Sequence, residues 1–200
     1  MIRLHTCTLI IVIFMLTACS VTPTVWQPYP KKLDYDTAKT GWKKGNLAPD
    51  FKFKTVDSNE KRLSDYEGKI VFLHFWGSWC KPCRREIPQI ESLYKQIDNP
   101  DIEFILLNMN EEFETSMAWM KKRGFDLPIF NSMSGGQSDK TPMTDVSGNR
   151  IPYALEYVPK TFVIDRNGLI VFRQDGSKTN WTSYVEVIKN VITESEHQYP

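Results

Sequence analysis

Two cysteines separated by two residues, Cys80 and Cys83, lie where a strand pattern gives way to a helix pattern. The run 70–76, Ile-Val-Phe-Leu-His-Phe-Trp, is typical of a buried central strand. After Cys80, apolar residues recur at helical spacing, which predicts a helix with one apolar face. A strand that leads directly into such a helix indicates a βαβ unit and an α/β domain.

The cysteine spacing suits reversible disulfide formation. One helical turn brings two Cα atoms to roughly 5 Å, inside the window of about 4.4–6.8 Å that a disulfide needs. A thiol at a helix N-terminus faces unpaired N–H groups and the positive end of the helix dipole, which lower its pKa. We therefore expect Cys80 to be the exposed attacking thiol and Cys83 the resolving thiol, with slight help from Lys81.

A structural disulfide and half of a zinc site are the alternatives for this pair. Zinc would need two more ligands, and the sequence shows no second Cys/His cluster. A bridge that closes so short a loop adds little stability. The spacing therefore favours redox chemistry, and we expect neither a metal nor a cofactor.

Further strands and helices follow from the same patterns. Strands are expected at 51–56, 102–109, 127–130, 161–165 and 169–173, and helices after Cys80, at 111–123 and from about 180 to 194. This alternation indicates a mainly parallel central sheet with helices on its faces. Asn167-Gly168 predicts a terminal antiparallel hairpin. Segment 131–153 is rich in Ser, Gly, Pro and Asp, and is expected to be a long loop.

The beginning of the chain has the pattern of an export signal. Arg3 precedes the apolar run 9–16, which is shorter than the roughly 20 residues that span a bilayer. Leu16-Thr17-Ala18-Cys19 resembles the lipobox of bacterial lipoproteins, which implies lipidation of Cys19 and, because Ser20 follows, an outer-membrane destination in a Gram-negative host. An ordinary signal peptide or an uncleaved anchor is the alternative. Disulfides persist outside the cytoplasm, so two cysteines in the body of the chain suggest redox work.

The segment after Cys19 is expected to be a tether, because it holds prolines and scattered aromatic residues without clear periodicity. These aromatic residues could pack on the domain or sit at the membrane surface; they are Trp26, Tyr29, Tyr35 and Trp42. The formal net charge of +1 gives no sign of a nucleic-acid partner.

Several motifs resemble known families. Phe75-Trp76-x-x-Trp79-Cys80-x-Pro82-Cys83 resembles the active site of the thioredoxin superfamily. Segments 45–51, Gly-Asn-Leu-Ala-Pro-Asp-Phe, and 63–69, Leu-Ser-Asp-Tyr-Glu-Gly-Lys, are similar to its TlpA/ResA-like branch. The resemblance covers roughly 46–194. It implies, over 46–200, a thioredoxin-like α/β fold with a central mixed sheet and helices on both faces. The export pattern and the lipobox-like segment predict a signal peptide over 1–18, and the segment without periodicity predicts a tether over 19–45.

The same resemblance implies roles for further residues. Glu86 matches an active-site glutamate that accepts or relays the Cys83 proton; the alternative is a solvated glutamate paired with a neighbouring Lys or Arg. Segment 158–162, Val-Pro-Lys-Thr-Phe, resembles the cis-proline loop. This implies a cis peptide bond at Pro159 and substrate contacts from Trp79, Val158 and Pro159.

Two features depart from the family pattern. His74 replaces the buried aspartate of cytoplasmic thioredoxins, and it could titrate near neutral pH or be a hydrogen-bonded core histidine. Segment 131–153 is longer than the usual connection, and a loop of this length could shape the choice of partner.

The resemblance implies an extracytoplasmic, membrane-anchored reductase. Its partners would be a disulfide-bearing client protein and a membrane thiol carrier as electron donor, in cytochrome c maturation or oxidative defence. A copper-binding redox chaperone using Cys80, Cys83 and His74 is one alternative. A peroxiredoxin-like antioxidant is another, because Ala-Pro-Asp-Phe also occurs there, but the Pro-x-x-x-Thr-x-x-Cys frame is missing.

Overall fold

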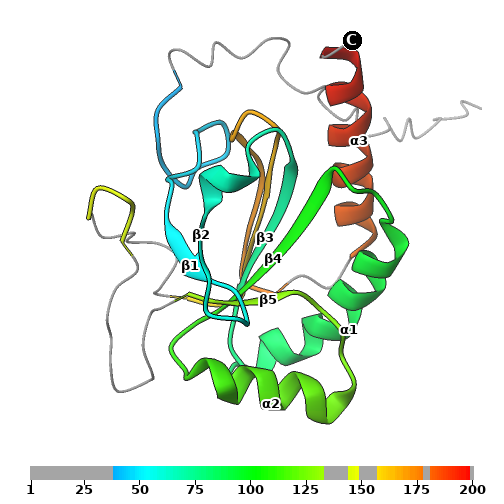
Figure 1. The fold of residues 1–200 in the computed structure, drawn as a ribbon. Coiled ribbons are helices and arrows are strands. Elements are labelled where there is room, and N and C mark those ends of the chain that lie inside the picture. Colours follow the sequence, from blue (N-terminus) through cyan, green and yellow to red (C-terminus); the bar gives the residue numbers. More distant parts are fainter. Residues whose placement is uncertain (1–37, 133–143, 149–156, 178–180, 199–200) are drawn as a thin grey trace, which may run out of the picture. The chain divides into compact units, whose positions relative to one another are not determined.

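The computed structural model describes residues 38–132, 144–148, 157–177 and 181–198 (Figure 1). Its elements, in chain order, are β1 (Lys52–Lys54), β2 (Glu60–Arg62), the 3-10 helix η2 (Leu63–Tyr66), β3 (Ile70–Trp76), α1 (Lys81–Gln96), β4 (Ile102–Asn108), α2 (Phe113–Arg123), β5 (Ile129–Asn131), β6 (Lys160–Ile164), β7 (Ile170–Asp175) and α3 (Thr182–Gln198). None of the helices in these ranges has the length and apolar character that crossing a bilayer requires.

The strands of the described ranges form one seven-stranded mixed sheet in the order β2-β1-β5-β4-β3-β6-β7. β3 pairs in parallel with β4, and β4 in parallel with β5. On its other side β3 pairs antiparallel with β6, which forms the predicted hairpin with β7. All seven residues of β3 are buried, as expected for a central strand covered on both faces.

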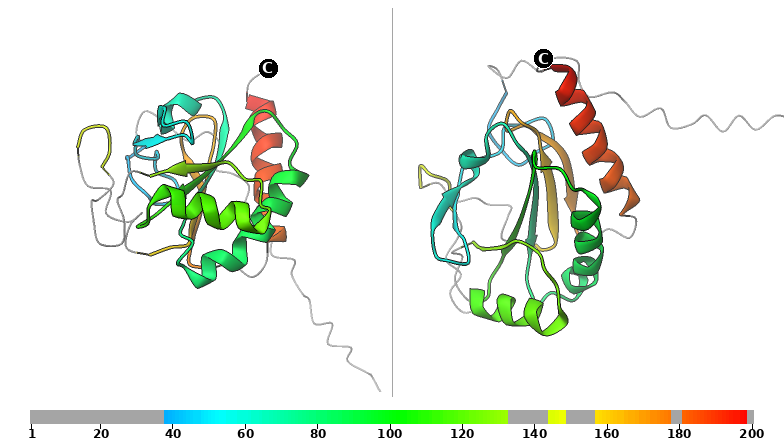
Figure 2. Two further views of the ribbon diagram at one scale, coloured as in Figure 1. Left: turned by 60° about the horizontal axis from the view of Figure 1, so that its bottom comes forward. Right: turned by 45° about the vertical axis from the view of Figure 1, so that its right-hand side comes forward.

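The two faces of the sheet carry different elements (Figure 2). Phe72 of β3 contacts Phe104 of β4 and Tyr184 of α3, with ring centroids 4.9 and 5.9 Å apart, so this face lies under α1 and α3. Phe75 points to the opposite face, where the core includes Phe51, which precedes β1, and Leu63, the first residue of η2. The predicted helices α1 and α3 therefore cover one face, and the 3-10 helix η2, which was not predicted, packs on the other. The remaining predicted helix, α2, contacts the end of β3, where the Trp119 and Trp76 rings have centroids 5.9 Å apart.

The expected tether is too long at its C-terminal end, because residues 38–45 already belong to the domain. Trp42 is buried, and its ring packs against those of Phe75 and Phe162 with centroids 5.8 and 5.0 Å apart. The backbone N–H of Gly45 donates to the carbonyl oxygen of Ile170. Burial of a large aromatic ring in the core fixes this segment. Residues 1–37, including the other three tether aromatics and Cys19, lie outside the described ranges.

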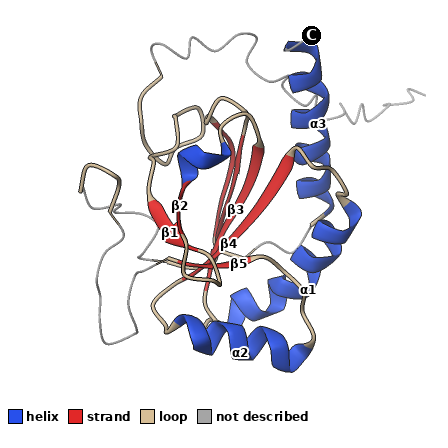
Figure 3. Cartoon of the chain, viewed as in Figure 1, coloured by secondary structure: helices blue, strands red, loops and turns tan. Residues whose placement is uncertain are grey.

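Figure 3 shows the helices and strands of the described residues, and most of them match their predicted positions. β2 was not expected, because its three residues are charged and exposed. It forms by pairing with β1, and an ion pair between Lys52 Nζ and Glu60 Oε1, 2.7 Å apart, joins the two strands. α2 ends before Gly124, which adopts the left-handed conformation with φ 72°. Of the predicted loop 131–153, Asn131 belongs to β5, and only Ser132 and 144–148 are otherwise described.

Candidate active site

The site is built on the junction of β3 and α1. Cys80 is the N-cap of α1, and its sulfur forms a disulfide with Cys83, with an S–S length of 2.08 Å and Cα atoms 5.2 Å apart. The backbone N–H of Cys83 donates to Cys80 Sγ over 3.2 Å. Pro82 fits this first turn because a proline lacks the N–H that would have no partner there. The predicted cysteine spacing and position on the helix are confirmed.

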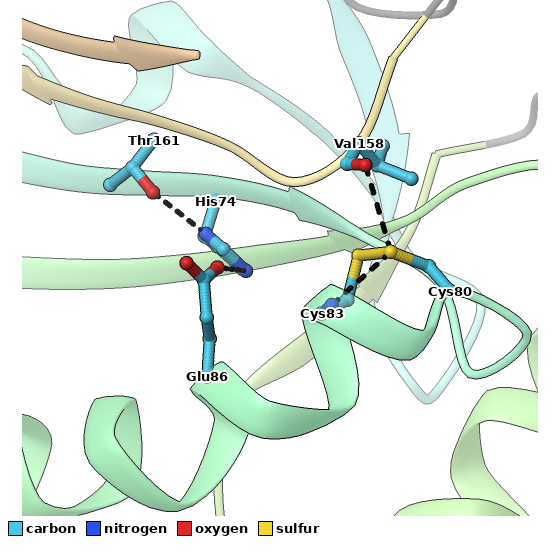
Figure 4. A network of polar contacts seen from close by, with 6 residues as sticks. All are labelled: His74, Cys80, Cys83, Glu86, Val158 and Thr161. Atoms are coloured by element: carbon cyan, nitrogen blue, oxygen red, sulfur yellow. Dashed lines mark hydrogen bonds and ion pairs between the residues drawn. A yellow bond between two sulfur atoms is a disulfide. The ribbon is translucent and has the colours of Figure 1, made fainter. Parts of the chain in front are cut away.

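The two sulfurs differ in depth, although less than predicted. Cys83 is fully buried, and Cys80, expected to be exposed, shows 4% of its surface. Part of the cover comes from Val158, whose carbonyl oxygen lies 3.6 Å from Cys80 Sγ (Figure 4). Cys80 remains the less buried residue of the pair, so the predicted order of the two thiols is compatible with this geometry.

Trp79, predicted to contact substrate, shows 42% of its surface beside Cys80. Its ring N–H donates to the carbonyl oxygen of Met109 over 2.8 Å, which anchors the edge of the ring. The ring also covers Gly77, where a Cβ atom would lie 2.4 Å from the Trp79 ring nitrogen. Gly77 is therefore required for this close approach.

The predicted cis peptide bond is present between Val158 and Pro159. The carbonyl oxygen of Pro159 accepts from the N–H of Gly176 over 2.9 Å, which ties the loop to the end of β7. The N–H of Val158 has no hydrogen-bond partner among the residues that the structure describes. This loop thus places one available backbone donor next to the disulfide.

Two buried polar side chains lie behind the disulfide, His74 of β3 and Glu86 of α1 (Figure 4). His74 Nδ1 shares a 2.9 Å hydrogen bond with the Thr161 hydroxyl, and Nε2 lies 3.9 Å from Glu86 Oε2. The alternative of a solvated Glu86 is wrong, since its side chain is only 2% exposed. An imidazolium would attract Glu86, but burial dominates and lowers the pKa of His74 to about 3, so titration near neutral pH is not supported.

Acid is expected to destabilise the protein through His74. The unfolded histidine binds a proton near pH 6.5, but the folded one does so only near pH 3, so unfolding takes up a proton between these values. The free energy of unfolding should therefore fall as the pH drops through this window, by at most about 1.4 kcal/mol per pH unit from this group. Urea denaturation of the wild type and His74→Gln from pH 7 to 3.5 measures the effect. Parallel curves for the two proteins would contradict it.

The sequence analysis did not identify Glu111, which holds the loop before Cys80. Its carboxylate accepts from the Ser78 N–H over 2.6 Å, from the Ser78 hydroxyl over 2.5 Å, and from the Ser116 hydroxyl over 2.7 Å. Arg84 secures the other side of the loop by donating to the carbonyl oxygen of Ser78 over 2.9 Å. Glu111 lies 33 positions from Ser78, so no local pattern connects the two.

The chain is similar in sequence to known proteins. Residues 44–173 match the AhpC/TSA family. The thiol-disulfide oxidoreductase ResA of Geobacillus kaustophilus is 36% identical over 135 residues, which cover 68% of this chain and 71% of that protein. The ResA of Geobacillus thermodenitrificans is 34% identical over 137 residues, covering 68% and 72%.

The fold has a matching counterpart among solved structures. The pneumococcal exposed lipoprotein thioredoxin Etrx1 from Streptococcus pneumoniae is 26% identical and superposes with a TM-score of 0.51, covering 70% of this chain and 98% of that one. With its disulfide at a helix N-terminus, its cis-proline loop and these relatives, the chain belongs to the AhpC/TSA family and is a thiol–disulfide oxidoreductase of the TlpA/ResA-like type.

Proposed function

We propose that this protein reduces disulfides of client proteins outside the cytoplasm, with Cys80 as the attacking and Cys83 as the resolving thiol. The observation that carries the proposal is the placement of Cys80 Sγ between the N–H of Cys83 and the loop of Val158. The helix N-terminus stabilises a Cys80 thiolate. The available Val158 N–H can pair with the backbone of a client strand beside that sulfur.

The exchange proceeds in two balanced steps. The Cys80 thiolate attacks one sulfur of the client disulfide, forming a mixed disulfide and releasing the other client sulfur, which takes up a proton. Cys83 then loses its proton and attacks Cys80 Sγ, which releases the second client thiol and forms the bond seen in the structure. The client gains two electrons and the protein loses two. A dithiol carrier in the membrane must return them for another cycle.

Glu86 is proposed as the base for the second step. It follows Cys83 by three residues on α1, a spacing that places two Cβ atoms about 5–6 Å apart on one helix face. Its side chain is buried, so its carboxylate can take the Cys83 proton without competition from bulk water. Its Oε2 lies 3.9 Å from Nε2 of His74, so the side chain is directed toward β3.

Replacing Glu86 with glutamine is expected to slow resolution of the mixed disulfide by about 10²-fold near neutral pH, the lower end of what a general base contributes. The rate of the variant should recover as the pH rises and solution hydroxide replaces the carboxylate. Stopped-flow measurement of both steps from pH 6 to 9 tests this. Glu86→Asp, which keeps a carboxylate, should regain part of the rate; identical pH profiles in wild type and Glu86→Gln would remove Glu86 from the mechanism.

A lipid anchor at Cys19 is a further part of the proposal. Cys19 lies outside the residues that the structure describes, so its support comes from elsewhere. Its support is the lipobox-like segment 16–19 and the likeness to a lipoprotein thioredoxin of Streptococcus pneumoniae. Expression in a bacterial host with labelled palmitate should label the wild type and leave Cys19→Ala unlabelled. Label in the variant, or none in either protein, would refute lipidation at Cys19.

The activity is tested with a peptide that contains one intramolecular disulfide. Reduced protein should convert it to the dithiol in a one-to-one reaction, and the equilibrium should favour oxidised protein. An equilibrium that favours reduced protein would make it an oxidase. Tight stoichiometric Cu(I) binding without exchange would support the copper-binding alternative, although no group of three or more His, Cys, Asp or Glu suited to a metal occurs in the described ranges.

A further inference from the structure

A cleft of about 660 Å³ opens beside the active-site disulfide. One wall is the start of α1, with Pro82 and Arg85. The other walls are the cis-proline loop, 157–160, and the end of β7 with the residues that follow, which contribute Arg173 and 175–177. The carbonyl oxygen of Val158 in this cleft lies 3.6 Å from Cys80 Sγ. A client segment that flanks a cysteine attacked by Cys80 would therefore lie in the cleft.

The lining of the cleft carries an excess of positive charge. Arg85, Lys160 and Arg173 are its cations, and Asp175 is its one carboxylate among the described residues. The Asp175 carboxylate forms ion pairs with two of these cations, with Arg173 Nη2 at 2.7 Å and with Lys160 Nζ at 3.5 Å. Lys160 is only 2% exposed, so its charge is fixed in the wall rather than dispersed in solvent. Such low-dielectric walls focus the field of their charges into a cleft.

Arg85 is the cation that a client can reach directly. Its side chain is exposed, and it forms no ion pair with another described residue. The first turn of α1 contains no acidic residue, and Lys81 and Arg84 follow Cys80 in the sequence of that turn. The helix N-terminus adds partial positive charge at this point.

The acidic groups near the disulfide do not cancel this field. Glu111 accepts hydrogen bonds from Ser78 and Ser116, so its carboxylate is directed into the loop. Glu86 is buried on the far side of the disulfide, facing His74. Among the described residues, the lining on the side from which a client approaches therefore holds three cations and one carboxylate.

We propose that this cleft selects client segments that carry Asp or Glu next to the reactive disulfide. The inference rests on the proposed function and adds the chemistry of its substrate. Charge complementarity of this kind acts mainly on the association rate and on the choice between partners. Arg85 is the specificity-determining residue, because it is the exposed cation among the described residues of the lining.

Three peptides of equal length test the proposal. Each peptide has a single cysteine, joined to thionitrobenzoate as a mixed disulfide, and the residues on both sides of that cysteine are Glu, Gln or Lys. Attack by the reduced protein releases the coloured thionitrobenzoate thiol. At about 20 mM salt the Glu peptide should react roughly tenfold faster than the Lys peptide, the lower end of electrostatic steering in clefts. At about 1 M salt, where the Debye length is near 3 Å, the ratio should approach one.

Arg85→Glu should abolish or reverse the Glu-to-Lys rate ratio. Because this ratio compares two substrates of one enzyme, it does not change with the reactivity of the Cys80 thiol. The matched control is Lys44→Glu, the same charge change at an exposed side chain. Lys44 precedes Gly45, which bonds to Ile170 at the start of β7. That position is about 17 Å along the strand from Asp175 at the cleft.

The outcomes separate the two proposals. A wild-type protein that reacts equally with all three peptides at low salt refutes the basic cleft and leaves the disulfide exchange intact. Equal loss of preference in Arg85→Glu and Lys44→Glu also refutes it, because overall charge would then explain the preference. No reaction with any peptide, from a protein whose Cys80 is free for alkylation, refutes the exchange activity and the cleft together.

Discussion

Replacing Cys80 with serine is expected to abolish turnover of a peptide disulfide, with a loss of at least about 10³-fold. A serine hydroxyl is not ionised near neutral pH and cannot form the mixed disulfide. Cys80 carries the sulfur beside Val158 and is the less buried residue of the pair, so Cys83 cannot replace it in the first attack. The measurement is the rate of peptide dithiol formation by the pre-reduced protein.

The variant should still fold, so its loss of activity is interpretable. The Cys80–Cys83 bridge closes a loop with a sequence separation of 3, and the loop-entropy model gives such a bridge about 2 kcal/mol or less. Circular dichroism and urea denaturation check the fold against reduced wild type. Turnover that persists in a folded Cys80→Ser, and is lost in Cys83→Ser, would reverse the roles assigned to the two cysteines.

Replacing Cys83 with serine should stop the reaction halfway, with most of the protein joined to its client through Cys80. The first attack does not need Cys83, but release of the client does. In the disulfide form Cys83 is fully buried and Cys80 shows 4% of its surface, so thiols in solution would reach the mixed disulfide slowly. Non-reducing electrophoresis and mass spectrometry of the adduct measure the effect.

The double variant Cys80→Ser/Cys83→Ser is the matched control, and it should trap nothing. The same experiment in the native cell envelope would recover client proteins. Asp or Glu beside their trapped cysteines would support the preference proposed for the cleft. An adduct in the double variant would mean that another thiol of the chain reacts. Absence of any adduct in Cys83→Ser would refute the two-step exchange.

Local patterns predicted the parts of the site that adjacent residues build. The strand at 70–76, the helix after Cys80 and the Cα separation of the cysteines follow from short-range periodicity and helix geometry, and the structure confirms them. The cis peptide bond before Pro159 came from the resemblance to a family and is also present.

Contacts between distant segments could not be predicted in the same way. The neighbours of Trp42 show no periodicity, so the sequence leaves open whether its ring packs on the domain or lies at the membrane surface; only the structure shows that it is part of the core. Glu111 holds the Ser78 loop across 33 positions, and the β4–α2 connection gives no local sign of it. The lowered pKa of His74 results from its complete burial, and its hydrogen-bond partner Thr161 lies 87 positions away.

The sequence by itself determined that two thiols one helical turn apart stand at the start of a helix, because backbone geometry and the helix dipole act within a few residues. Only the tertiary structure decided what surrounds them: a buried His74–Glu86 pair behind, a carboxylate that holds the preceding loop, and a cleft with excess positive charge in front. Burial and electrostatic fields are properties of the assembled sheet and helices, because they depend on which distant residues meet.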